Sequence, residues 1–341
     1  MEQIKKAAKK QIFKISTATS LTIIAIVVIT NAIFIGIMEI MGDAYADFTA
    51  NVLDDMSFSL IIQDIVMIIG LLVYCKIMKV NLKAHFGKPQ MKKSEIFALI
   101  IMATGLGQLT SIITNLLMTL VTMTTGFEIG AVSFVSERNL LSTIVVSLAI
   151  AVGAPILEEL FFRASFFTPL VPHGRMLAVT VTAVIFGLYH MNVPQIPAAI
   201  VWGFFFGYIS LESRSIIPAI LGHIFNNSFG ALQYAIMGNL DLDRIAGGDT
   251  EYMMANLGTF IPLACISFCI YGIIFAAIIL FIIRLAKRGK DAFRITGASE
   301  ENNVLTKGEA FAAYFVNPAT IILMLMVIGM TIFTVIGMRS A

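Results

Sequence analysis

Pro155-Ile-Leu-Glu-Glu-Leu-Phe-Phe-Arg-Ala-Ser-Phe-Phe167 places three charged side chains inside an apolar run that begins near Leu140. A charge at membrane depth costs about 2.5–3.5 kcal/mol on insertion scales. Glu159 and Arg163 stand four residues apart, so they can pair along one face of a helix. This pairing leaves Glu158 as the carboxylate without a local partner. The stretch therefore predicts a buried helix in which Glu158 faces a polar group from another segment.

The whole chain has the composition of a membrane protein. Its 341 residues are 58% hydrophobic and 13% charged, and the mean hydropathy is +0.90. Soluble domains carry about 25% charged residues, so a soluble globular fold is excluded. The net charge of +2 gives no reason to expect a nucleic-acid partner. Three cysteines, all in apolar runs, predict neither a disulfide framework nor a zinc knuckle.

Apolar segments of roughly 20 residues predict the number of membrane spans. We expect an all-α fold, a polytopic transmembrane helical bundle of about nine spans, with eight also possible. The first segment is longer than a signal-peptide core, so we expect it to be retained. The nine segments are Ile15–Ile37, Met56–Cys75, Ile96–Val121, Leu140–Thr168, Met176–His190, Ile196–Leu211, Ile216–Met237, Leu257–Ile283 and Pro318–Met338.

The loops between these segments alternate in charge. Lysines and arginines precede the first segment and follow the second and the eighth, whereas Gly42–Asp55 and Asn239–Asn256 are acidic. By the positive-inside rule, this alternation predicts a multi-pass protein of the cell membrane with a cytoplasmic N-terminus and an external C-terminus. We divide the chain into a three-span region (1–137), a four-span core (138–238) and a two-span region (239–341).

Few polar residues lie at membrane depth, and three of them are candidates for a functional site. His190 ends the fifth segment, while His223 and Asn227 are four residues apart in the seventh, on one helix face. Asn226 should point elsewhere. Asp64 in the second segment is open to two interpretations, a proton or ion site and a hydrogen-bonded packing contact, and packing is the simpler one.

Helix geometry places the unpartnered carboxylate at a similar depth to these groups. With ~1.5 Å of rise per residue, Glu158, His190 and His223 lie roughly 12–22 Å from the cytoplasmic ends of their segments. A desolvated glutamate is a good general base, and the histidines with Asn227 can stabilise an oxyanion. Alternatively, zinc could be held by Glu158, His190 and His223. The residues alone do not choose between an activated water without metal and a zinc-bound water.

Competing features are weaker. The sequence contains no HExxH, no Gly-x-Ser-Gly and no Gly-x-Gly-Asp. We interpret Ser165 as a packing residue, and the Gly203/Gly207 pair as a site of close helix packing. His85 and His173 fall in loops, where we expect them to be solvated.

Three motifs in order resemble the CPBP family of intramembrane proteases, the CAAX-protease and bacteriocin-processing (Abi) group. The family pattern Glu-Glu-x-x-x-Arg matches Glu158 to Arg163, Phe-x-x-x-His matches Phe186 to His190, and His-x-x-x-Asn matches His223 to Asn227. Each motif is weak by itself and the combination is strong. The resemblance covers about residues 138–238.

The resemblance implies a role for each matched residue. Glu158 would be the base that activates water, assisted by His190, and His223 with Asn227 would hold the oxyanion. Glu159, Arg163 and Phe186 would support these groups. Family members include endopeptidases that trim prenylated proteins and bacterial proteins tied to bacteriocin immunity and peptide processing. Metal use in the family has been argued both ways, so the cofactor is either none or a divalent metal such as zinc.

We therefore expect an endopeptidase that cleaves a membrane-associated protein or peptide, with membrane lipid as its other partner. A non-proteolytic membrane scaffold or regulator of a membrane partner is the alternative. A transporter with Asp64 and Glu158 as coupling residues is a third hypothesis, which the lack of an inverted repeat disfavours.

Overall fold

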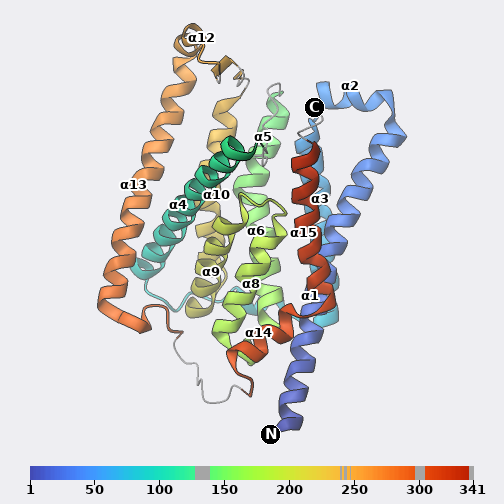
Figure 1. Cartoon of the computed structure of the whole chain (residues 1–341), viewed down its shortest axis with the longest axis vertical. Helices are drawn as coiled ribbons and strands as arrows, with labels where there is room; N and C mark the ends of the chain where they lie inside the picture. The colour runs from blue at the N-terminus through green and yellow to red at the C-terminus, as the bar shows by residue number, and fades with distance from the viewer. Residues whose placement is uncertain (127–138, 239, 242–243, 246, 296–303, 338–341) are drawn as a thin grey trace.

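The computed structural model describes residues 1–126, 139–238, 240–241, 244–245, 247–295 and 304–337. Over these residues the chain forms helices and no strand. Most of the longer helices stand side by side (Figure 1). The elements are α1 Glu2–Met41, α2 Asp43–Asn51, α3 Asp55–Met78, η1 Leu82–His85, α4 Lys93–Thr125, α5 Leu140–Leu148, η2 Ala149–Gly153, α6 Ala154–Glu159, η3 Leu160–Phe166, α7 Phe167–Leu170, η4 Val171–His173, α8 Arg175–Tyr189, α9 Ile196–Ser213, α10 Ile217–Met237, α12 Thr250–Ala255, α13 Leu257–Arg288, η5 Gly289–Asp291, α14 Lys307–Phe315 and α15 Pro318–Gly337.

Each of the nine predicted apolar segments is helical over most of its described residues, but fewer helices qualify as membrane spans. Met338, the predicted end of the ninth segment, lies outside the described residues. Six helices in the described residues are long and apolar enough to cross a membrane, or up to seven if α14 and α15, bent by 67°, form one span. Helix α8 has 15 residues, about 22 Å at 1.5 Å per residue, which is shorter than the ~30 Å hydrocarbon core. Helix α10 interrupts its apolar run with the polar residues of the third motif. An all-helical, multi-pass membrane protein is confirmed; nine spans remain a prediction.

Gly203 lets α8 and α9 approach each other closely. A Cβ atom on Gly203 would lie 2.9 Å from Ala183 Cα, and one on Gly207 would lie 3.5 Å from Val179 Cγ1. Larger side chains at Gly203 would push the helices apart. The predicted close packing at this pair is therefore present.

Helices α1 and α15, which come from the two ends of the chain, are joined by buried hydroxyl and amide groups. Thr320 Oγ1 lies 2.6 Å from Ser16 Oγ and 2.8 Å from Ser20 Oγ. Asn317 Nδ2 donates to Thr17 Oγ1 at 2.8 Å, just before the bend. Interhelical hydrogen bonds of this kind hold helices together where lipid supplies no hydrophobic force. This contact places the C-terminal helix at the side of the bundle away from α13 (Figure 1).

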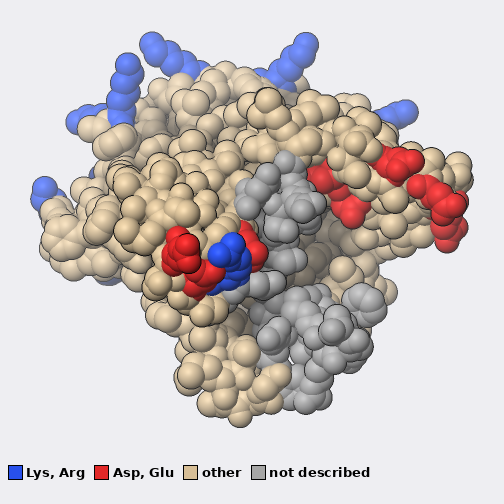
Figure 2. All heavy atoms as spheres, turned by 90° about the horizontal axis from the view of Figure 1, so that it is seen from above, with Lys and Arg blue, Asp and Glu red and all other residues tan. Residues whose placement is uncertain are grey.

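The two ends of the bundle differ in charge. The end near α12 carries Asp241, Asp249 and Glu251, and in the view onto this end acidic side chains gather on the surface while most basic ones project at the rim (Figure 2). Arg244 is the exception, because its guanidinium pairs with Asp249 at 2.6 Å. This asymmetry is the one from which a cytoplasmic N-terminus was predicted, and the sidedness itself stays a prediction.

Candidate active site

The helical run from Leu140 to His173 is wider than an α-helix on both sides of the paired glutamates. Two π-helical segments, η2 and η3, flank α6, which ends at Glu159. The first has a clear cause, because Pro155 has no N–H and cannot donate to a carbonyl of the preceding turn. In η2 the hydrogen bonds shift by one residue, so that Ala154 N donates to Ala149 O. Such π segments occur frequently at functional sites.

The same shift leaves a carbonyl group that α10 satisfies. In the π register, Ile150 O would accept from residue 155, which is a proline and has no hydrogen to give. Asn227 Nδ2 donates to this oxygen instead, at 3.1 Å. Asn227 Oδ1 in turn accepts from Asn226 Nδ2 at 3.1 Å. One N–H of Asn227 therefore ties α10 to the broken helix, and its second N–H has no partner in the hydrogen bonds of the described residues.

A chain of buried charged groups links three helices. Glu159 Oε2 lies 3.3 Å from Arg163 Nε, as the i,i+4 spacing predicts, and both side chains are fully buried. The other carboxylate oxygen, Oε1, lies 2.9 Å from His223 Nδ1. Because a carboxylate can only accept, Nδ1 carries the hydrogen and the neutral ring presents the lone pair of Nε2. Glu159 thus fixes the tautomer and the orientation of His223.

Glu158 faces the opposite side of the same imidazole. Its Oε2 atom lies 3.6 Å from His223 Nε2, and 8% of the residue is exposed. This distance is too long for a direct hydrogen bond, but one water molecule can bond to both atoms. The partner that the sequence left open for Glu158 is therefore His223.

Aromatic rings shape the walls around the two histidines. Phe206 stacks on His223 with ring centroids 5.1 Å apart. Phe186 meets both imidazoles edge to face, at 4.9 Å for His190 and 5.8 Å for His223. These apolar rings lower the local polarity beside the imidazoles and so strengthen the electrostatic contacts of the cluster.

His190 belongs to the same cluster but not to its ion pairs. It caps the C-terminal end of α8, and its Nδ1 atom lies 2.8 Å from Phe186 O. No carboxylate of the described residues lies within ion-pair distance of its ring. If Nδ1 donates to the carbonyl, Nε2 is left as the acceptor. His190 and His223 thus both contact the Phe186 ring, and His190 forms no ion pair with Glu158.

Arg163 is less well satisfied than a buried arginine normally is. Its guanidinium lies 4.4 Å from the centre of the Phe186 ring, and Nη2 reaches the bare backbone oxygen of Gly203 at 3.5 Å. The contact with Glu159 lacks hydrogen-bond alignment, and Nη1 has no hydrogen-bond partner among the described residues. Stacking on an aromatic ring stabilises such a cation by about 2 kcal/mol when it is desolvated.

Tyr189 near the site escaped the sequence reasoning, whereas Asp64 was considered as either a proton site or a packing contact. Tyr189 precedes His190, and its hydroxyl accepts from Gln63 Nε2 at 3.2 Å, so α3 borders the cluster. Asp64 is half-buried on the same helix, and a Cβ atom on Gly153 would lie 3.4 Å from Asp64 Oδ2. Asn226 was expected to point elsewhere, but it is 3% exposed and bonded to Asn227. Adjacent polar residues in the sequence, Gln63-Asp64 and Asn226-Asn227, are the signal that could have indicated these contacts.

The arrangement does not fit a metal held by three protein ligands. Among the described residues, no group of three His, Cys, Asp or Glu side chains converges on one point in a way that could hold a metal ion. His223 Nε2 and Glu158 Oε2 could contribute two ligands. We therefore derive the chemistry from the side chains alone.

Comparison with known proteins agrees with this cluster. Residues 138–229 match the family model described as type II CAAX prenyl endopeptidase Rce1-like. Searches of curated proteins and of solved structures found no match. The matched segment contains the π-flanked glutamates, Arg163, both histidines and Asn227. Residues 138–229 of this chain are therefore a domain of the Rce1-like CAAX prenyl endopeptidase (CPBP) family.

Proposed function

We propose that the protein is an intramembrane endopeptidase that hydrolyses a peptide bond in a membrane-associated protein or peptide, with Glu158 as the general base. The observation that carries this proposal is the facing pair of Glu158 Oε2 and His223 Nε2, 3.6 Å apart. Glu159 holds the opposite side of the imidazole at Nδ1, so Nε2 is directed toward Glu158. A carboxylate and an imidazole so placed can polarise one water molecule.

The reaction would begin with the transfer of a proton from water to Glu158 as the water oxygen attacks the carbonyl carbon of the substrate. The carbonyl π electrons move to oxygen and give a tetrahedral oxyanion. Collapse of this intermediate re-forms the carbonyl and breaks the C–N bond, while Glu158 returns the proton to the leaving nitrogen. Atoms and charge balance, and the products are a carboxyl group and an amine.

The neighbouring groups would stabilise the oxyanion. Asn227 has one N–H bonded to Ile150 O and a second N–H to donate. A donor of this kind contributes about 2.7–4 kcal/mol to transition-state stabilisation. His190 has Nδ1 bonded to Phe186 O, which leaves Nε2 as an acceptor. We assign Asn227 the stabilisation of the oxyanion, and the two histidines the orientation of the water.

The surrounding helices would deliver a substrate from the bilayer. In this proposal the protein is a nine-span protein of the cell membrane with a cytoplasmic N-terminus, and the domain at 138–238 is flanked by regions 1–137 and 239–341. Gln63 from the first region donates to Tyr189 of the core beside the site, so α3 would form one side of the substrate path.

Cleavage of a membrane-tethered peptide by purified protein in liposomes tests the proposal. Removing a general base lowers the rate by about 10²–10⁴-fold, so Glu158→Gln should lose activity on this scale. The loss should appear in kcat, with the thermal midpoint nearly unchanged because Gln keeps the volume and the polar edge of the side chain.

Glu39→Gln is the matched control, because Glu39 is an exposed carboxylate near the end of α1 and should leave the rate unchanged. Full activity of Glu158→Gln in well-folded protein would contradict the proposal. It would favour a role of the cluster in regulating a membrane partner.

A further inference from the structure

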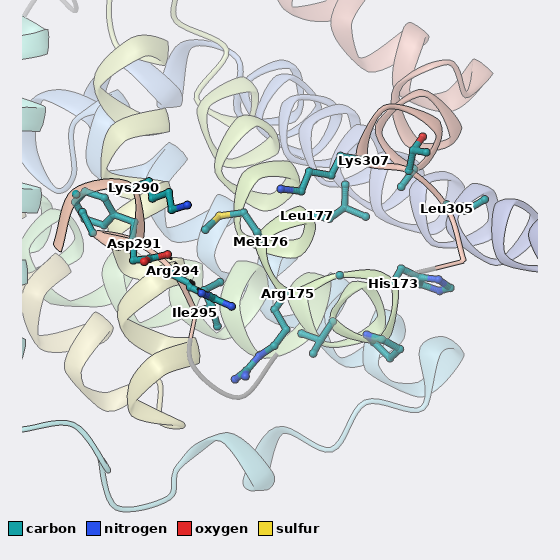
Figure 3. A pocket seen from close by; sticks show the side chains of 18 of the residues that line it. His173, Arg175, Met176, Leu177, Lys290, Asp291, Arg294, Ile295, Leu305 and Lys307 are labelled. Atoms are coloured by element: carbon teal, nitrogen blue, oxygen red, sulfur yellow. Dashed lines mark ion pairs between the residues drawn. The ribbon is translucent and has the colours of Figure 1, made fainter. Parts of the chain in front are cut away.

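A cavity lies at the end of the bundle where the chain begins, away from the glutamates. It has a volume of about 840 Å³ and lies between the first turn of α8, the segment that follows α13 and the first turn of α14 (Figure 3). None of its lining residues belongs to the cluster around Glu158. It therefore requires a separate explanation.

Basic side chains dominate the polar part of this cavity. Arg175, Lys290, Arg294 and Lys307 line it, and Asp291 is the only acid among its described lining residues. Lys290 and Lys307 extend toward one another from opposite walls (Figure 3). The arrangement concentrates positive potential on the space between the two ammonium groups.

No acidic group of the described residues neutralises the positive charge of Lys290 or Lys307. Asp291 Oδ1 pairs with Arg294 at 3.5 Å. Glu309 lies on the same helix as Lys307, but its oxygens take Lys9 at 3.1 Å, Lys5 at 3.5 Å and the backbone N–H of Thr306. Glu309 therefore faces α1. Neither Lys290 nor Lys307 forms an ion pair with a described carboxylate.

The first turn of α8 adds further positive character. This helix begins after Gly174, which has φ +140° and no side chain to cap the helix. The first N–H groups of α8 are thus uncapped by a side chain and lie at the cavity, where the helix dipole favours an anion. This terminus supports the basic side chains and does not define the site by itself.

Part of the cavity lining is apolar, and this decides between kinds of anion. Val171, Leu177, Leu285, Phe293 and Leu305 contribute to the lining. A small soluble anion would gain nothing from these groups. An amphiphile can place its charged group near the lysines and its glycerol and acyl carbons against the apolar side chains.

We propose that this cavity binds the phosphate headgroup of an anionic phospholipid. The cavity lies at the ends of α13 and of the apolar run that closes at His173, both of which are candidate membrane spans. A headgroup is therefore at the right depth, and basic pockets between membrane helices suit such ligands. This site is independent of the peptidase proposal.

Binding of phosphatidylglycerol and of phosphatidylcholine to the full-length protein in detergent tests the site, with affinities measured by native mass spectrometry. The wild type should prefer phosphatidylglycerol. The double variant Lys290→Gln/Lys307→Gln should weaken phosphatidylglycerol binding about tenfold or more, because each basic side chain contributes substantially to anionic lipid affinity. Phosphatidylcholine binding should not change.

Lys83→Gln/Lys287→Gln is the matched control. Both lysines are exposed at the same end of the molecule and do not line the cavity, so their removal should change the affinity by less than about twofold. An equal loss in both double variants would overturn the proposal in favour of general surface attraction. Absence of a preference for phosphatidylglycerol would overturn it as well.

Two further arms separate the remaining outcomes. Inorganic phosphate and glycerol 3-phosphate should fail to displace the lipid at equal concentration; displacement would assign the cavity to a soluble phosphate and overturn the lipid proposal. A photoactivatable phosphatidylglycerol should label the wild-type protein within the lining residues. Labelling elsewhere would overturn the proposal even if the lysine variants failed to fold.

Discussion

Arg163 and Arg284 each pair with a glutamate in this protein, and their surroundings differ. Arg284, in the last turns of α13, has all three kinds of nitrogen bonded: Nε to Ala292 O at 2.7 Å, Nη1 to Glu95 at 3.1 Å and Nη2 to Tyr208 Oη at 2.9 Å. Arg163 lacks such partners for Nη1, and its pair with Glu159 is not aligned as a hydrogen bond. Arg284 is held in a complete polar network, and Arg163 is not.

The two sites differ in the second partner that each glutamate carboxylate takes. Glu95 takes a second cation, Arg288 at 2.9 Å, and closes a network at the end of the bundle. Glu159 turns its second oxygen to an imidazole whose far side faces another carboxylate. A complete network favours a single rigid arrangement, whereas the open chain at Glu159 directs one atom of His223 toward a reaction volume. We infer a structural role for the pair at Arg284 and a positioning role for the pair at Arg163.

The largest expected effect is the loss of stability when Glu159 is removed. Glu159→Ala leaves Arg163 as an uncompensated cation and should lower the free energy of unfolding by about 3–5 kcal/mol. Glu158→Ala removes a carboxylate that has no cationic partner of this kind, so its stability loss should be much smaller. Unfolding in a titration with sodium dodecyl sulfate measures both. Equal losses in the two variants would contradict the proposed division between Glu158 and Glu159.

The next effect concerns the complete network. Arg284→Gln removes hydrogen bonds that a charged donor makes to three partners, which should cost about 1.5–3 kcal/mol of unfolding free energy, discounted because Glu95 is partly exposed. Cleavage activity per folded molecule should stay within about twofold, since no atom of the cluster around Glu158 moves. Lys287→Gln, one turn away and exposed, serves as the control. A loss of kcat in folded Arg284→Gln would remove the distinction between the two arginines.

A smaller effect tests the hydrogen bond between the Asn227 side chain and the Ile150 carbonyl in η2. If Asn227 stabilises η2 because Pro155 leaves Ile150 O without a donor, then Pro155→Ala should weaken the need for Asn227. The stability loss on Asn227→Ala should shrink by about 1 kcal/mol in the Pro155→Ala background. The double-mutant cycle measures this coupling. Additive losses would mean that the hydrogen bond at Ile150 does not depend on the proline.

These contacts also explain which parts of the site the sequence could predict. The Glu159–Arg163 pair follows from spacing on one helix, and the helical segments follow from apolar length. The contact of Glu159 with His223 could not be predicted, because it depends on the rotation of α6 between two π segments. Helical wheels assume 3.6 residues per turn, and the shift of one residue in η2 and η3 changes the faces on which Glu158 and Glu159 lie.

Fewer helices than predicted qualify as membrane spans, for a related reason. Helix α8 is short because it ends at His190, within the site, and α10 is polar because it carries His223 and Asn227. Segments that supply functional groups inside a membrane depart from the apolar length that predicts spans. The same groups that indicate the site therefore weaken the signal for the fold.

The smallest expected effect sharpens the contrast between histidines inside and outside the site. His85 was expected to be solvated, but it is half-buried, and its Nε2 atom lies 3.0 Å from Thr168 Oγ1, whose hydroxyl donates to Ala164 O. Burial lowers the pKa of His85 below its ordinary value of 6.5. As the pH falls below about 6.5, the unfolded chain therefore binds a proton at His85 more readily than the folded chain does. The free energy of unfolding decreases as the pH falls further.

His85→Gln should remove this contribution while keeping a donor for Thr168. The unfolding free energies of wild type and variant, compared between about pH 7.5 and 5, should differ in slope by less than about 1 kcal/mol over the range, with the wild type losing more. Groups that titrate elsewhere in the protein cancel in the comparison. A wild type that gains stability relative to His85→Gln on acidification would mean that the imidazole is protonated in the folded state, and that the contact with Thr168 stabilises the cation.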